Sequence, residues 1–254
     1  MGTLIGVLST ESAAVVDHIT ALRAATAEFV RTLALTPLDA RPPTFKSWTV
    51  TDLVAHLGAV HRWAADIVET GHRANRQNRP ELSETPSVWY DGGRSRLLEV
   101  LTSTDPERAC WTHHPDDRIV RYWHRRQLHE TVVHLWDLRS VLAPGDALAD
   151  LDPDVCADGV DEVLTVFPRR SSPADRGTLQ GKVGLRATDT GRSWTVAAGW
   201  ELVEGIDAPT DAVVSGPAGA LLLFVWRRPL DRSAVAVEGD GAVLAAFRNA
   251  NVIP

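Results

Sequence analysis

The chain has 254 residues, of which 44% are hydrophobic, and its 26 basic and 33 acidic residues give a formal net charge of −7. A chain of this length can bury a core without cross-links, in one large or two modest domains. The acidic balance, with arginines scattered along the chain, argues against nucleic acid and anionic membrane surfaces as partners and favours a small-molecule ligand.

The two cysteines and the N-terminal sequence predict the compartment. Cys110 and Cys156 are too few for a disulfide framework and lack metal-type spacing, so we expect free thiols in a reducing environment. The stretch MGTLIGVLSTES lacks a basic start, and no apolar run is long enough to span a membrane. These features predict a cytoplasmic protein without a membrane partner.

Four helices are predicted in the first 145 residues, which makes a helical bundle the natural architecture. They span 10–35, 49–70, 92–102 and 119–142. Apolar residues recur at spacings of three and four in the first of them. Thr49 and Asp52 form a capping box with a shortened acid at the start of the second, and Gly71 ends it. The polar segment 72–86 is predicted to be a loop.

The apolar period changes after residue 148, which predicts a bundle domain over 1–148 and a small α/β domain over 149–254. The predicted elements are a helix at 154–167, a surface connector at 168–173, two strands in VGLRATDTGRSWTVAAG, a strand at 212–215, a helix after Gly216-Pro217, a strand at 235–238 and a helix at 242–248. The fold class expected for the whole chain is therefore α+β.

The segment HETVVHLWD, residues 129–137, is close to the helix of a zinc protease, but its histidines are five residues apart instead of four. On a helix, His129 and His134 then lie roughly 140° apart and cannot bind one ion together. Glu130 and His134 are four residues apart and project side by side. Asp137 follows three residues later and either orients His134 or accepts hydrogen bonds from an arginine.

A third ligand is predicted on the second helix, whose apolar stripe comprises Leu53, Leu57, Val60, Ala64 and Ile67. His56 falls about 60° from the centre of this stripe and should point into the bundle, toward the fourth helix. Three ligands, His56, Glu130 and His134, would leave an open coordination position, as in catalytic zinc sites. From spacing alone, an exposed ion pair and a hydrogen-bonded histidine are the commoner arrangement.

Other candidate sites are weaker. A ferritin-like di-iron site needs Glu-x-x-His twice, and neither copy is present. We expect His113-His114 to lie in a solvated loop, and His124 and His129 to pack in the bundle or lie on its surface. The nine tryptophans are expected in the core, with some lining a pocket.

Five segments together resemble, in the same order, the mycothiol-dependent maleylpyruvate isomerase family. They are WTVTDLVAHLGAVHRWA, WHRRQLHETVVHLWDL, LRATDTGRSWTV, SGPAGALLLFVWRRPL and VEGDGAVLAAF, and they extend over nearly the whole chain. The resemblance implies an N-terminal DinB-like metal-binding four-helix bundle, followed by a small α/β domain similar to sterol-carrier-like folds.

The resemblance also implies site residues. The family's divalent ion, typically zinc, is bound by a histidine of the second-helix motif and by the Glu and His of an E-x-x-x-H helix, which match His56, Glu130 and His134. The family's functional arginine matches Arg228, or less closely Arg227, in VWRRPL. The chain departs from the family pattern at Arg227, where many relatives have glycine, and at Leu135, where HRWD is the commoner form.

The chemistry that the resemblance implies begins with the thiol of mycothiol at the metal's open position, held as the reactive thiolate. The thiolate would attack a small electrophile, by S-conjugation or by cis–trans isomerisation such as maleylpyruvate to fumarylpyruvate, while Arg228 pairs with an anionic group of the substrate or the thiol. Two alternatives stay open: a non-catalytic metal- or ligand-binding sensor, and a lipid-binding role for the C-terminal unit.

Overall fold

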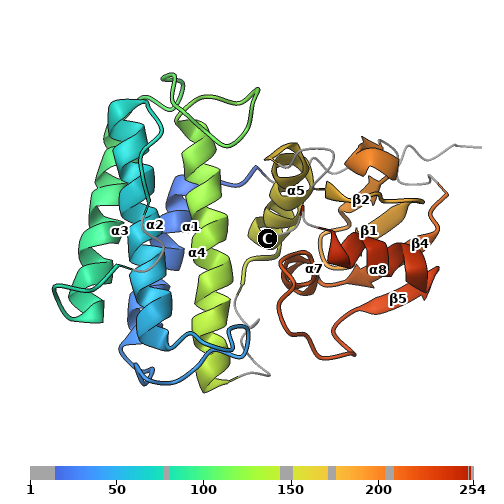
Figure 1. The fold of residues 1–254 in the computed structure, drawn as a ribbon, viewed down its shortest axis with the longest axis horizontal. Coiled ribbons are helices and arrows are strands. Elements are labelled where there is room, and N and C mark those ends of the chain that lie inside the picture. The colour runs from blue at the N-terminus through green and yellow to red at the C-terminus, as the bar shows by residue number, and fades with distance from the viewer. Residues whose placement is uncertain are drawn as a thin grey trace, which may run out of the picture.

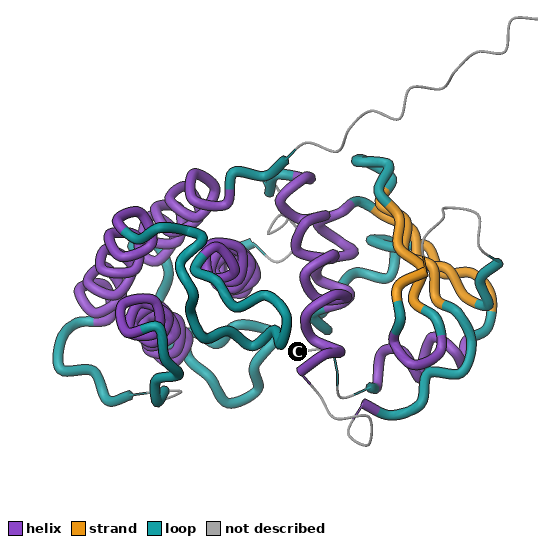
Figure 2. Tube along the Cα trace, turned by 90° about the horizontal axis from the view of Figure 1, so that it is seen from above, coloured by secondary structure: helices purple, strands orange, loops and turns teal. Residues whose placement is uncertain are grey.

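The computed structural model describes residues 15–76, 80–143, 151–170, 176–203, 209–250 and 252. Four helices form a bundle in the N-terminal half, and a five-stranded sheet with helices follows (Figure 1). Seen from above, α5 (Pro153–Arg170) runs between the bundle and the sheet (Figure 2). The predicted α+β class is therefore confirmed.

The bundle helices are α1 (His18–Leu33), α2 (Val50–Thr70), α3 (Pro86–Ser103) and α4 (Arg121–Leu142). α3 begins six residues before its predicted start, because Pro86 occupies its first turn, where a missing N–H costs nothing. Gly93 lies inside this helix, since a Cβ there would come within 3.0 Å of the Gly58 carbonyl on α2. Gly93, one residue after the predicted start at Gly92, thus serves close packing of α2 and α3.

The sheet is mixed, with strand order β3-β2-β1-β4-β5. Its strands are β1 (Val183–Ala187), β2 (Ser193–Val196), β3 (Leu202–Val203), β4 (Ala212–Gly216) and β5 (Ala236–Gly239). β1 pairs antiparallel with β2 and parallel with β4, and both β2–β3 and β4–β5 are antiparallel. The predicted hairpin over residues 183–199 is thus present, whereas β3 and the 3₁₀ turn η1 (Ala198–Trp200) were not predicted.

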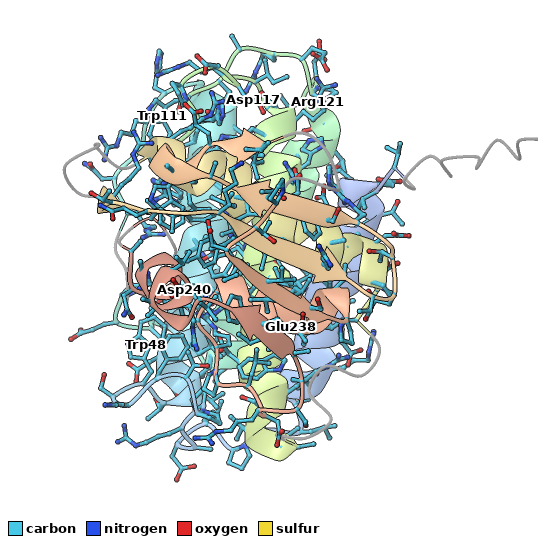
Figure 3. All side chains as sticks on the ribbon, turned by 90° about the vertical axis from the view of Figure 1, so that its right-hand side faces the viewer. Trp48, Trp111, Asp117, Arg121, Glu238 and Asp240 are labelled. Carbon is cyan, nitrogen blue, oxygen red and sulfur yellow. The ribbon has the colours of Figure 1, made fainter. Side chains whose placement is uncertain are left out.

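Helices α7 (Ala218–Val225) and α8 (Gly241–Asn249) cover one face of the sheet. Phe247 of α8 stacks on Phe224 of α7, with ring centroids 6.4 Å apart. The carboxylate of Asp189, in the turn between β1 and β2, accepts a hydrogen bond of 2.9 Å from the Ala218 N–H and so caps α7. Figure 3 looks onto the other face of the sheet, with the bundle behind it.

α5 joins the two halves into one apolar core. Its buried residues Cys156 and Val160 belong to a continuous cluster that also contains Trp123 of the bundle and Leu221 of α7. Cys110 and Cys156 are free and buried, as predicted. No helix among the described residues is long and apolar enough to cross a membrane.

The segment predicted to connect α5 to the first strand begins as helix. The surface connector expected from Pro168 is wrong for residues 168–170, because α5 continues to Arg170; a proline in the last turn removes only one helix hydrogen bond. The remaining part, 171–173, the predicted first helical turn at 10–14 and the boundary between residues 148 and 149 lie outside the described residues.

Candidate metal centre

Helices α2 and α4 carry the three predicted ligands. The capping box at the start of α2 is complete: the Thr49 hydroxyl accepts from the Asp52 N–H at 3.3 Å, and the Asp52 carboxylate accepts from the Thr49 N–H at 2.8 Å. The apolar stripe behind it is buried throughout, at Leu53, Leu57, Val60, Ala64 and Ile67. His56, on the flank of that stripe, faces α4.

His56, Glu130 and His134 converge in the structure. Oε1 of Glu130 lies 3.7 Å from Nε2 of His56 and 3.4 Å from Nε2 of His134. One ligand atom from each residue lies within 4.8 Å of the other two. A tetrahedral zinc ion with bonds of about 2.0–2.1 Å keeps its ligand atoms about 3.4 Å apart. Two imidazoles and a carboxylate at this spacing therefore fit such an ion.

The electrostatics of the three side chains also suit a cation. Burial raises the pKa of the Glu130 carboxyl, but hydrogen bonds from His134 and His56 and the charge of Arg126 hold it well below its usual range. Burial lowers the pKa of His134, but its contacts with Asp137 and Glu130 outweigh burial and raise it. The Glu130 carboxyl is thus held in its charged form, which is the form that binds a metal ion.

Asp137 fixes the orientation of His134. Its fully buried carboxylate lies 2.9 Å from Nδ1 of His134, and because it can only accept, Nδ1 carries the proton and Nε2 is left for an ion. The same carboxylate accepts two hydrogen bonds from Arg228, at 3.0 Å from Nε and 2.8 Å from Nη2, and one from Thr44 at 2.7 Å. Asp137 therefore both orients His134 and binds an arginine.

The structure places Arg228 behind the ligands. Its side chain is 8% exposed and its remaining nitrogen donates to the Trp226 carbonyl, so its fork is directed at Asp137 and not into open space. A backbone turn positions Arg228 after the end of α7. The Arg228 N–H donates to the Leu223 carbonyl at 2.9 Å and closes a Schellman turn. Arg227 takes the left-handed position of that turn (φ 54°), which glycine normally occupies.

Arg126 holds the second oxygen of Glu130. Its Nη2 lies 2.7 Å from Oε2 of Glu130, one turn along α4, and its Nη1 contacts Glu162 of α5. Arg126 and Glu162 are almost fully buried. Both α4 ligands are thus supported from the C-terminal half of the chain, Glu130 through Arg126 and Glu162, and His134 through Asp137 and Arg228.

A second group with metal-type side chains consists of His18, His129 and Asp158. Oδ2 of Asp158 lies 3.0 Å from Nε2 of His18 and 2.7 Å from Nε2 of His129. Arg125, however, lies 3.0 Å from both oxygens of this carboxylate and supplies the cation. This group ties α1, α4 and α5 together, and it confirms that His129 and His134 serve different sites.

A cavity of about 600 Å³ opens beside the three ligands, and His56 and Glu130 are part of its wall. Four aromatic side chains also line it: Trp63, Trp111, Phe167 and Trp226. His113 lines it too and is half-buried, so the expectation that it lies in a solvated loop is wrong. In Figure 3, Trp111 and Trp48, whose ring packs on His56, lie toward opposite ends of the bundle.

The sequence analysis did not predict several residues that lie beside the candidate ligands. Arg126 lies four residues before Glu130, so helical spacing could have placed it beside that ligand. Glu162 and the aromatic wall carry no such signal, because tertiary packing alone brings them to the site.

The comparisons with known proteins match both halves of the chain. The family model described as the mycothiol maleylpyruvate isomerase N-terminal domain matches residues 19–139, and the model of the C-terminal domain of the same family matches residues 154–246. No curated protein matches the chain.

Two solved structures share the fold. A mycothiol-dependent maleylpyruvate isomerase superposes with a TM-score of 0.61 at 15% identity, and a histidine-to-alanine variant of such an isomerase with a TM-score of 0.63 at 14% identity. Each likeness covers 87% of this chain and 92% of the other. At this level of identity the likeness shows the common α+β architecture.

Proposed function

We propose a function from one premise: the chain belongs to the mycothiol maleylpyruvate isomerase family, whose two domain models together match most of its length. We infer an enzyme that binds a divalent metal, zinc by its donor set, with His56, Glu130 and His134. With mycothiol as its thiol cofactor, it acts on a small electrophile as an S-transferase or an isomerase.

The convergence of the three ligands beside a cavity carries this proposal. Their ligand atoms lie within 4.8 Å of one another, and two of the three side chains line a cavity of about 600 Å³. A structural zinc site is normally closed by four protein ligands, whereas a catalytic one keeps a position open. Three ligands next to a cavity of ligand size favour the catalytic kind.

Bound at this site, the ion would hold a thiol as its thiolate, the nucleophile that isomerisation and S-transfer share. The chain's own residues prepare the site. Asp137 holds the proton on Nδ1 of His134 and so presents Nε2. Arg126 restrains Oε2 of Glu130 and leaves Oε1 between the two imidazoles.

For Arg228 we propose a positioning role, since it acts on His134 through Asp137. Direct contact of Arg228 with the thiol or the substrate stays a sequence-based prediction, as does a role for Arg227, whose side chain donates to the Ala250 carbonyl. The cytoplasmic location and the domain division at residue 148 are likewise proposals.

The test incubates metal-loaded protein with mycothiol and a panel of electrophiles that includes maleylpyruvate. We expect thiol consumption or cis–trans conversion that is lost in Glu130→Gln. His124→Asn, a histidine of the same helix outside the three ligands, is the matched control and should keep the activity. Activity that survives Glu130→Gln contradicts the proposal, and ligand binding without turnover favours the sensor alternative.

A further inference from the structure

Gln127 places an unused hydrogen-bond donor in the wall of the cavity beside the three ligands. It lies on α4 three residues before Glu130, so the two side chains share one face of that helix. The residue is only 1% exposed, yet its side chain belongs to the cavity lining. Within the described parts of the chain, no group accepts a hydrogen bond from its amide nitrogen. This nitrogen is therefore available to a molecule bound in the cavity.

His61 of α2 fixes the direction of this amide. Its Nδ1 lies 2.9 Å from Oε1 of Gln127, and both side chains are buried. Burial lowers the pKa of His61 to about 4, so the imidazole is neutral at physiological pH and carries one proton. Because an amide oxygen only accepts, that proton is on Nδ1. With its oxygen held by His61, the amide of Gln127 directs its NH₂ group toward the cavity.

The surroundings of His61 show that packing alone does not explain a histidine at this position. Nε2 of His61 and the hydroxyl of Tyr90 on α3 are both buried, and neither has a hydrogen-bond partner among the described residues. The two ring centroids lie 5.6 Å apart. A buried polar group without a partner destabilises a fold. An apolar side chain would avoid that cost, so the geometry favours a role for His61 in orienting Gln127.

Three other donors in the cavity lining differ from Gln127. Arg126 is committed to two carboxylates. The indole N–H of Trp63 donates to the Ala74 carbonyl at 2.8 Å. Asn75 carries an amide like that of Gln127, but the residue is exposed. A buried donor that is already held in place needs no reorganisation when negative charge develops beside it, which makes such donors effective in catalysis.

We propose that Gln127 is a catalytic residue whose amide N–H donates to the carbonyl oxygen of the electrophile while the thiolate adds to the conjugated carbon. This inference rests on the proposed function, to which it adds a residue. The new bond joins sulfur to carbon, and the electron pair of the double bond moves through the conjugated system to the oxygen that Gln127 contacts. Return of the pair expels the sulfur in isomerisation, whereas a proton from water on the adjacent carbon completes conjugation. His61 is a positioning residue, since it acts through Gln127.

The test compares two electrophiles, with mycothiol and the full-length, metal-loaded protein. 2-Cyclohexenone is activated by a carbonyl, whereas benzyl chloride reacts by losing chloride and develops no charge on oxygen. We expect Gln127→Leu to lower kcat for 2-cyclohexenone by about 100-fold, as for loss of one donor to an oxyanion, and to change the benzyl chloride reaction little. Gln180→Leu, the same substitution at an exposed glutamine outside the cavity lining, is the matched control.

Two variants of His61 separate positioning from packing. His61→Asn keeps an N–H near the place of Nδ1 and should retain most of the 2-cyclohexenone activity. His61→Leu should lower that activity selectively. A role in packing alone predicts the reverse order, because leucine removes the unpartnered Nε2 whereas asparagine leaves polar atoms in the core.

A binding measurement tests the donor without thiol or turnover. Acetophenone and α-methylstyrene have the same shape, but a CH₂ group replaces the carbonyl oxygen in the second. In NMR titrations of the metal-loaded protein, we expect acetophenone to bind about fivefold more tightly, the ratio expected for one net neutral hydrogen bond. Acetophenone should also shift the side-chain amide signal of Gln127, and Gln127→Leu should abolish the preference.

An equal loss of both thiol reactions in Gln127→Leu, no loss of either, or equal binding of the two probes overturns the inference. Thiol consumption by the wild-type protein leaves the proposed function standing in each of these cases. A wild-type protein that consumes no thiol with either electrophile contradicts the proposed function, while a Gln127-dependent preference for acetophenone still supports the donor role. If Gln127→Leu does not fold, the order of the two His61 variants decides.

Discussion

Replacing Asp137 by asparagine tests whether the contacts behind the ligands prepare the metal site. Oδ2 of Asp137 accepts from His134 and Arg228, and Oδ1 accepts from Arg228 and Thr44. An amide of the same shape offers one oxygen and turns its NH₂ toward a donor on the other side. The variant therefore weakens the hold on His134 and leaves the buried Arg228 without a counter-charge.

The expected effects are of two kinds. Loss of a contact behind a metal-bound histidine typically lowers metal affinity by about 10–100-fold. Breaking a buried ion pair costs about 3–5 kcal/mol, and we expect the lower end because the amide oxygen of Asp137→Asn still accepts one of the hydrogen bonds. Chelator competition gives the metal affinity, and urea unfolding of the metal-free protein gives the free energy of unfolding.

A double variant separates the two effects. Adding Arg228→Gln to Asp137→Asn removes the unpaired guanidinium, so part of the lost stability should return. Metal affinity should stay low, because His134 still lacks its carboxylate. Asp66→Asn, which alters an exposed ion pair between α2 and Arg96 of α3, is the matched control. Wild-type metal affinity in a folded Asp137→Asn protein would show that Asp137 does not prepare His134 for the ion.

Three further predictions concern the contacts of α5. Arg126→Gln leaves the buried Glu162 carboxylate without its cation and should lower the free energy of unfolding by about 3 kcal/mol or more in urea titrations. Burial opposes ionisation of Asp158, yet its hydrogen bonds with histidines hold the pKa of that carboxyl below the unfolded value of 3.8. The ionised Asp158 carboxylate therefore stabilises the folded state fully above pH 3.8, and this stabilisation is lost as the pH falls through the folded-state pKa. The difference in free energy of unfolding between wild type and Asp158→Asn should therefore shrink in acid. A difference that is independent of pH would contradict this prediction. Gly159→Ala puts a Cβ 2.8 Å from Leu222 and should cost about 1–3 kcal/mol, seen as a lower Tm; an unchanged Tm would show that α5 and α7 can separate freely.

Local signals predicted much of the bundle and the convergence of the three candidate metal ligands. The Thr49–Asp52 capping box and Gly71 fixed the ends of α2, and the phase of its stripe placed His56 toward α4. The spacing of Glu130 and His134 then placed the other two candidate ligands on one face of α4. These features depend on neighbours within one helical turn, which a sequence displays directly.

The missed features depend on tertiary contacts. Pro168 predicts a helix end at Phe167, but α5 continues to Arg170, and Phe167 packs edge-on against Trp226 of the C-terminal half. The two-residue strand β3 is too short for a periodic pattern and exists through pairing with β2. Glu162 and Arg170 reach the site and its cavity only because α5 packs beside α4.

X-ray absorption and metal analysis of zinc-loaded protein test whether His56, Glu130 and His134 together bind a metal ion. We expect one ion per chain, bound by two imidazole nitrogens and one carboxylate oxygen, and loss of that ion in the double variant His56→Ala with Glu130→Ala. Failure to bind a stoichiometric ion, or an ion that persists undiminished in the double variant, would contradict it.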